Sequence, residues 1–138
     1  MTNWTPKLTN VAGTDGTSGA GRYAVSADGI CVFTAQIAAK KETAAADSSG
    51  FGLTLPVPAA PGCRYVFSAS LDGRDADNGV WTGEAQIYAG SDGTKIDRIR
   101  VTGGSNGAAV QNIGHLYGDA EGATAAEIIT VTGSYPTA

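Results

Sequence analysis

The sequence predicts an all-β protein, an antiparallel two-sheet sandwich with a jelly-roll-like arrangement of about eight strands. Short runs of alternating apolar and polar residues are bounded by Gly, Asp and Ser. Twenty glycines and only 16% charged residues favour tight turns over charged helices. Because 138 residues make one domain of ordinary size, residues 1–138 are expected to form a single sandwich.

The candidate strands follow one another along the whole chain. Each is rich in β-favouring residues and ends at Gly, Pro, Asn, Asp or Ser. They are Trp4–Val11, Gly21–Ala27, Ile30–Ala38, Phe51–Leu55, Arg64–Leu71, Val80–Tyr88, Thr94–Thr102 and Glu127–Tyr135, with Ala108–Ile113 a further strand or an irregular crossing. The three runs between Arg64 and Thr102 are expected to form a central meander, and the last run to close the fold.

The first run carries Pro6, which has no N–H to donate to a sheet. The segment is therefore expected at a sheet edge or as an arm, with residues 1–6 a possible N-terminal anchoring arm. Trp4 could cap its own sandwich or insert into a partner, and we favour the anchor because Trp is common among interface hot spots.

The segment Gly16–Gly21 resembles a phosphate-binding loop in its glycine content. It lacks the Gly-Lys-Ser/Thr ending and precedes a strand, so no helix N-terminus would face an anion. We therefore expect a flexible turn there.

Two further connections can be predicted. Asp28-Gly29 lies between alternating runs and predicts a hairpin with a type I′ turn, which needs positive φ at both positions. Ala39–Gly50 contains helix-favouring residues but is too short to form a stable helix without packing. We interpret it as a loop.

Both cysteines are predicted to be buried and free. Cys31 is in phase with the apolar residues Phe33, Ala35 and Ile37, and Cys63 is in phase with Tyr65, Phe67 and Ala69. A disulfide remains the alternative, because spacing alone does not fix the separation of the two Cα atoms.

Charge and hydropathy exclude several classes of partner. The net charge of −4 and pI of about 4.7 leave few residues for a phosphate-binding surface, so nucleic acid is not an expected partner. No apolar run approaches the ~18 residues of a membrane span, and the polar start has no secretory signal. The chain is expected to be made in a cytoplasm.

No candidate catalytic or metal site meets its chemical requirements. The only histidine, His115, lies in neither a nucleophile elbow nor a cysteine-protease signature, which favours a structural or surface role. The acidic loop Asp72–Gly79 has alternating oxygens but fails the EF-hand register, which favours a solvated loop over a lone Ca²⁺ site. Glu84 and Asp97 could face each other across a hairpin as a glycosidase pair, a weak indication. We predict no enzyme activity, catalytic residue, bound metal or cofactor.

An ordered series of short motifs covers almost the whole chain. They are Trp4-Thr5-Pro6-Lys7-Leu8-Thr9-Asn10-Val11, Gly21-Arg22-Tyr23, Gly52-Leu53-Thr54-Leu55-Pro56-Val57-Pro58-Ala59-Ala60, Trp81-Thr82-Gly83 and Ile129-Thr130-Val131-Thr132-Gly133-Ser134-Tyr135. In this order the chain resembles the β-sandwich domains of tailed-bacteriophage virion proteins, especially minor tail, fibre and capsid decoration proteins of phages that infect actinobacteria. The resemblance implies an oligomer displayed on the particle.

The expected function is therefore that of a virion structural protein. No stalk or tail-attachment segment precedes Trp4, so we expect a capsid decoration or minor capsid protein that binds the assembled head as a homo-oligomer, a trimer. Its partners would be the major capsid protein or another virion protein, with Trp4, Pro6, Trp81 and Tyr88 as interface candidates. The alternatives are a tail-fibre or baseplate module whose loops, such as Asp72–Gly79 and Gly103–Gly107, contact a host-surface glycan, and a small carbohydrate-active enzyme.

Overall fold

The computed structural model describes residues 1–72, 80–102, 110–118 and 127–138, and these residues form strands without any helix. The all-β class is confirmed, with an arrangement consistent with a sandwich. The thirteen strands are β1 (Thr2–Trp4), β2 (Leu8–Thr9), β3 (Thr17–Val25), β4 (Ile30–Ala39), β5 (Thr43–Ala44), β6 (Gly52–Thr54), β7 (Tyr65–Asp72), β8 (Val80–Ile87), β9 (Lys95–Ile96), β10 (Arg98–Thr102), β11 (Gln111–Asn112), β12 (His115–Leu116) and β13 (Ile128–Pro136).

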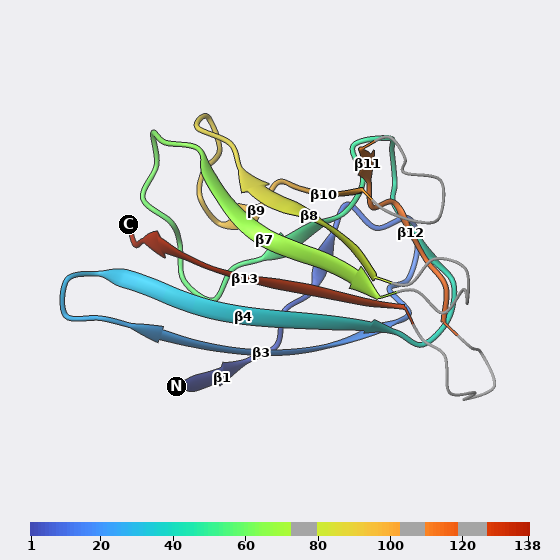
Figure 1. The fold of residues 1–138 in the computed structure, drawn as a ribbon, viewed down its shortest axis with the longest axis horizontal. Coiled ribbons are helices and arrows are strands. Elements are labelled where there is room, and N and C mark those ends of the chain that lie inside the picture. The colour runs from blue at the N-terminus through green and yellow to red at the C-terminus, as the bar shows by residue number, and fades with distance from the viewer. Residues whose placement is uncertain (73–79, 103–109, 119–126) are drawn as a thin grey trace.

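One large sheet dominates the molecule (Figure 1). Its eight antiparallel strands run in the order β1-β3-β4-β13-β7-β8-β10-β11, while β2-β6-β9 and β12-β5 form sheets of three and two strands. The strands are more numerous than the eight expected, since short pieces such as β5 and β12 pair outside the alternating runs. The last strand, β13, lies between β4 and β7 in the middle of the large sheet.

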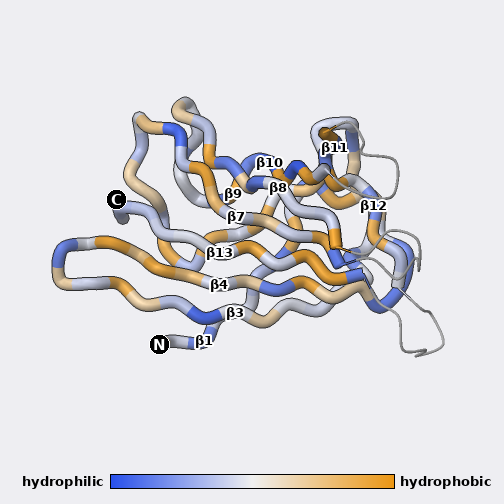
Figure 2. Tube along the Cα trace, in the orientation of Figure 1, coloured by the Kyte–Doolittle hydropathy of each residue, from blue (hydrophilic) through white to orange (hydrophobic). Residues whose placement is uncertain are grey.

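The core lies between the large sheet and the smaller ones. Alternate residues of β4 from Cys31 to Ala39 are buried, and Leu8, Leu53 and Ile96 join the same cluster from the three-stranded sheet. Figure 2 shows apolar segments along the adjoining strands β4, β13 and β7. The rings of Phe33, Phe67 and Tyr135 meet here with centroids 5.1 to 5.9 Å apart. Tyr135 is a core residue that also donates a hydrogen bond, from its hydroxyl to the Val57 carbonyl at 2.7 Å.

The hairpin between β3 and β4 is confirmed, but its turn is of a different type. Gly29 has φ +79°, whereas Asp28 is not among the described residues with positive φ. The Gly29 N–H donates to the Ser26 carbonyl, and the Ser26 N–H donates to the Ile30 carbonyl. A tight turn followed by a left-handed glycine is the common three-residue hairpin loop, and it needs only one position of positive φ.

The predicted strand Trp4–Val11 is divided between two sheets. β1 pairs with the edge of β3, and β2 pairs with β6 in the smaller sheet. Pro6 lies at the crossing with its side chain fully buried. Both β1 and β2 are edge strands of their sheets, so the expected edge position is confirmed, and a proline suits the crossing because no sheet partner is needed there.

The prediction of a flexible turn at Gly16–Gly21 is wrong, because β3 begins at Thr17. A β-carbon at Gly19 would lie 2.1 Å from the Pro6 carbonyl oxygen, and one at Gly21 would lie 2.3 Å from the Trp4 indole Nε1. The absence of side chains at Gly19 and Gly21 therefore lets Pro6 and Trp4 pack directly against β3. Close approach of another backbone is a recognised use of glycine within strands.

The central meander is confirmed, since β7, β8 and β10 are neighbours and β8 pairs with β10 antiparallel. The run Thr94–Thr102 is interrupted at Asp97, which separates β9 from β10. The expected loop Ala39–Gly50 contains β5, which pairs with β12. Of the run Ala108–Ile113, the described part contributes β11, and residues 108–109 lie outside the described residues.

The two cysteines differ in exposure. Cys31 is buried as predicted, but Cys63 is exposed, and both thiols are free. β7 begins only at Tyr65, so its alternation does not extend back to Cys63. Gly62, with φ +97°, turns the chain just before this residue. The prediction of a buried Cys63 is therefore wrong, and the alternative of a disulfide is not realised.

Candidate functional site

The four predicted interface residues do not form one patch. Trp4 lies on β1 and Trp81 on β8, and the strands β3, β4, β13 and β7 separate them in the sheet. At about 4.8 Å per strand, this places the two strands more than ~20 Å apart. Trp81 is partly buried against the core, and the side chain of Pro6 is fully buried.

Trp4 lies at an exposed edge with one unsatisfied group. Its ring lies over Gly21 and packs partly against the core. The indole N–H is buried and has no hydrogen-bond partner among the described residues. An open groove of about 640 Å³ runs beside it and reaches Arg22, Gln36 and Thr130.

Tyr88 follows β8 and borders a polar cleft of about 430 Å³. The guanidinium carbons of Arg98 and Arg64 lie 5.4 and 5.6 Å from the centre of its ring. The Tyr88 N–H donates to Oδ2 of Asp97 at 2.8 Å, and the Asp97 N–H donates to the Gln86 carbonyl. These contacts hold the ring and the carboxylate in place.

The opposite wall of the cleft is built from β2 and the turn before Phe51. Asn10 has φ +60°, a conformation that Asn tolerates better than most residues. Its side-chain amide donates to Asp47 Oδ1 at 3.0 Å and to the Gly50 carbonyl at 2.8 Å. The hydrogen bond from Asn10, followed by those from Ser49, lowers the pKa of Asp47, so this carboxyl stays ionised.

Two residues that line the cleft also carry buried polar atoms, Nε of Arg98 and Oγ1 of Thr9, which make no hydrogen bond with the described residues. Lys95 from β9 also lines the cleft. The lining of the cleft therefore combines carboxylates with cationic side chains, which is an arrangement suited to a polar ligand.

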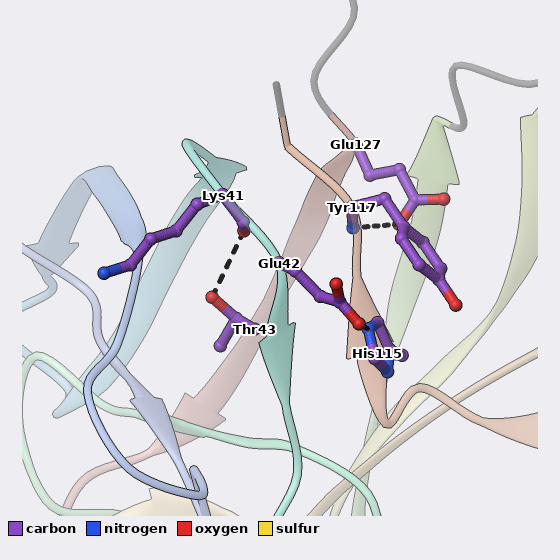
Figure 3. A network of polar contacts seen from close by, with 6 residues as sticks. All are labelled: Lys41, Glu42, Thr43, His115, Tyr117 and Glu127. Atoms are coloured by element: carbon purple, nitrogen blue, oxygen red, sulfur yellow. Dashed lines mark hydrogen bonds and ion pairs between the residues drawn. The ribbon is translucent and has the colours of Figure 1, made fainter. Parts of the chain in front are cut away.

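The single histidine belongs to a different cluster (Figure 3). His115 Nε2 lies 2.7 Å from Oε1 of Glu42, and its ring stacks on Tyr117 with centroids 4.3 Å apart. The Tyr117 N–H donates to Oε2 of Glu127 at 2.9 Å. No described hydroxyl or thiol hydrogen-bonds to the imidazole, so a nucleophilic triad is not assembled within this part of the chain. The cluster links β12 to the segments that precede β5 and β13.

Glu84 and Asp97, the weakly indicated glycosidase pair, do not face each other across the hairpin. Glu84 lies opposite Arg100 in the ladder between β8 and β10, whereas Asp97 is bonded to Tyr88. Of the acidic loop Asp72–Gly79, residues 73–79 lie outside the described residues, as does the loop Gly103–Gly107. Among the residues that the structure describes, no group of three or more metal-ligating side chains gathers, and no helix could span a membrane.

Comparison with protein families, curated proteins and solved structures found no match. Among the cleft residues, the sequence pattern indicates Tyr88 as an interface candidate and carries no sign of a role for Asn10, Asp47, Lys95 or Arg98. These residues come from four separate segments, so spacing along the chain carried no sign of their meeting. A local hint was present at Asp47-Ser48-Ser49-Gly50, a composition typical of a side-chain-bonded turn.

Proposed function

We propose that the protein is a structural component of a phage particle, a capsid decoration or minor capsid protein that binds the assembled head as a homo-oligomer. The resemblance of its ordered motifs to phage virion domains motivates the proposal. The structural observation that supports it best is the exposed edge at β1, where Trp4 carries a buried N–H with no partner among the described residues.

An uncovered sheet edge favours contact with another chain. One side of β1 pairs with β3, and the other side has no strand partner among the described residues. Edges with free backbone groups pair readily with other chains unless they are protected, and β1 carries neither proline nor charge. A virion partner at this edge would satisfy the unpaired backbone groups of β1.

The outer face of the large sheet offers a second, broader contact surface. A row of polar residues crosses six neighbouring strands in register: Arg22, Thr34, Thr132, Ser68, Glu84 and Arg100. A polar face of this kind suits a hydrated contact that is weak for one copy. On a lattice, many such contacts add up, because each bound copy restricts its neighbours.

The test is addition of purified protein to particles that lack it, followed by pelleting. The proposal expects the protein to self-associate and to sediment with heads that are already assembled. Separate incubations with detached heads and detached tails locate the binding site. Sedimentation with tails and not with heads would refute the decoration role.

The second candidate is a receptor-binding or baseplate module that contacts a host glycan. The polar cleft beside Tyr88 favours it, because sugar recognition needs donors and acceptors side by side. Binding to tails in the same experiment would support this function.

A further inference from the structure

The cleft beside Tyr88 has the size and the fixed walls of a small-ligand site. Its volume of about 430 Å³ lies within the ~300–1,000 Å³ usual for such sites. Four separate backbone regions meet there: the end of β2, the turn at Asp47–Gly50, Tyr88 after β8, and the segment from Lys95 to Arg98. Hydrogen bonds on both walls hold the side chains of Asn10, Asp47 and Asp97 before any ligand enters.

The charges in the cleft balance. The lining contains two carboxylates, Asp47 and Asp97, and two cations, Lys95 and Arg98. A phosphate or a carboxylate would meet the two acidic groups, and a metal cation would meet Lys95 and Arg98. The lining therefore attracts neither anions nor cations strongly, because each kind of ion meets repulsive charges as well as attractive ones.

The polar side chains that line the cleft are of both kinds. Lys95 and Arg98 carry N–H donors, and Asp47 and Asp97 carry carboxylate acceptors. One oxygen of Asp97 accepts from the Tyr88 N–H. An apolar ligand would cover these groups without replacing their hydrogen bonds to water, at a cost in free energy.

We propose that this cleft binds a neutral carbohydrate through adjacent hydroxyl groups. A sugar hydroxyl accepts from a cationic donor and donates to a carboxylate at the same time, so a pair of neighbouring hydroxyls matches Arg98, Lys95 and Asp97 together. The inference rests on the second candidate function, a glycan-contacting module, and names its ligand class; it does not depend on attachment to the head, because the cleft is separate from the groove at β1.

The test is a titration of the full chain, followed by amide NMR, with a panel of neutral monosaccharides and disaccharides. At least one sugar should cause saturable shifts at Thr9, Asn10 and Asp97, while inorganic phosphate and calcium ions should not. Lys95→Met and Asp97→Asn should each weaken that binding about tenfold, the effect of losing one charge-assisted hydrogen bond. Asn at position 97 keeps an oxygen that can accept from the Tyr88 N–H, so the fold is retained.

The matched controls are Lys40→Met and Asp15→Asn, which make the same chemical changes at exposed residues outside the cleft. They should bind the sugar as the natural chain does. Failure of every sugar in the panel to give saturable shifts would overturn the proposal. Tighter binding of phosphate at the same amides, or unchanged sugar affinity in both cleft variants, would overturn it as well. Pelleting of the same variants with heads tests the decoration role independently, so that failure of sugar binding can be distinguished from failure of head binding.

Discussion

At the scale of single residues, glycine and tyrosine determine how the central core fits together. A β-carbon at Gly133 would lie 2.4 Å from the Phe67 ring, so the absence of a side chain makes room for that ring beside Tyr135. Tyr135 fills the remaining space and is 1% exposed. Its hydroxyl must therefore find a partner inside the protein, and it does so at the Val57 carbonyl.

The buried hydroxyl predicts a loss of stability in alkali. Burial, followed by the hydrogen bond with Cys31, raises the pKa of Tyr135 above its ordinary value of 10.0, and burial raises the pKa of Cys31 above 9.0. The folded state therefore keeps these protons while the unfolded chain releases them. The free energy of unfolding should be constant through neutral pH and fall as the pH rises above about 9 to 10, measured by denaturant unfolding.

The variant Tyr135→Phe isolates the tyrosine part of this effect. It should cost about 1 kcal/mol at neutral pH through loss of the hydrogen bond to Val57. Above about pH 10 the free energy of unfolding of this variant should fall less steeply than that of the natural chain. The two slopes should differ by roughly 1.4 kcal/mol per pH unit, the effect of one proton. Tyr65→Phe is a control for the lost bond, since the Tyr65 hydroxyl also donates to a carbonyl, that of Ala60. An alkaline slope equal to that of the natural chain would contradict the prediction.

At the scale of elements, β1 combines a structural contact with an attachment role. The Trp4 ring covers Gly21 across the strand pair, and an aromatic side chain over a strand glycine restores packing that the glycine lacks. The indole Nε1 is the ring atom that lies nearest Gly21, and its N–H is buried without a hydrogen-bond partner among the described residues. Substitutions that keep or remove the ring can therefore separate the packing role from the attachment role.

The prediction for Trp4→Phe is weaker binding with nearly unchanged stability. Phenylalanine keeps an aromatic ring over Gly21 but removes the N–H, so affinity for heads should fall by about 1 kcal/mol. Trp4→Ala should lower affinity by ~2 kcal/mol or more and also lower the melting temperature, because both contacts are lost. Pelleting measures binding, and thermal unfolding of the free protein measures stability.

Trp81→Phe makes the same change at the other tryptophan and should leave head binding unaffected. If Trp4→Ala melts much earlier while its folded fraction binds heads normally, then Trp4 serves the core and the attachment surface lies elsewhere.

At the scale of the whole molecule, stability is expected to come from packing alone. The core is continuous from the large sheet to the three-stranded sheet, and both thiols are free. No group of three metal-ligating side chains gathers among the described residues. A sandwich held by its core should be indifferent to reagents that remove metals or reduce disulfides.

The corresponding prediction is an unchanged melting temperature in EDTA and in a thiol reductant. For a domain of this size, 1 kcal/mol corresponds to a few degrees, so even a modest contribution would be seen by calorimetry. A fall of many degrees in EDTA would show that a metal contributes to stability and would direct attention to the acidic loop Asp72–Gly79. Re-addition of calcium or magnesium would then identify the ion.

Local patterns predicted the elements of this fold well where one strand face is buried and the other is exposed. The alternation from Cys31 to Ala39 is preserved residue by residue in β4, and the meander from Tyr65 to Thr102 is formed by consecutive neighbours. Predictions failed where a contact with a distant segment changed the local outcome. The glycines of β3 are strand residues because Trp4 and Pro6 lie over them, and Cys63 is exposed because β7 begins two residues later.

The sequence by itself determined the all-β class, the hairpin at Asp28-Gly29 and the burial of Cys31, since each depends on neighbours along the chain. Only the tertiary structure decided which distant residues meet. It brought Asn10, Asp47, Lys95 and Arg98 around Tyr88, and it separated Trp4 from Trp81 by four strands. The physical reason is that side-chain alternation specifies which face of a strand is buried, whereas the order of strands in a sheet depends on long-range pairing that no local pattern encodes.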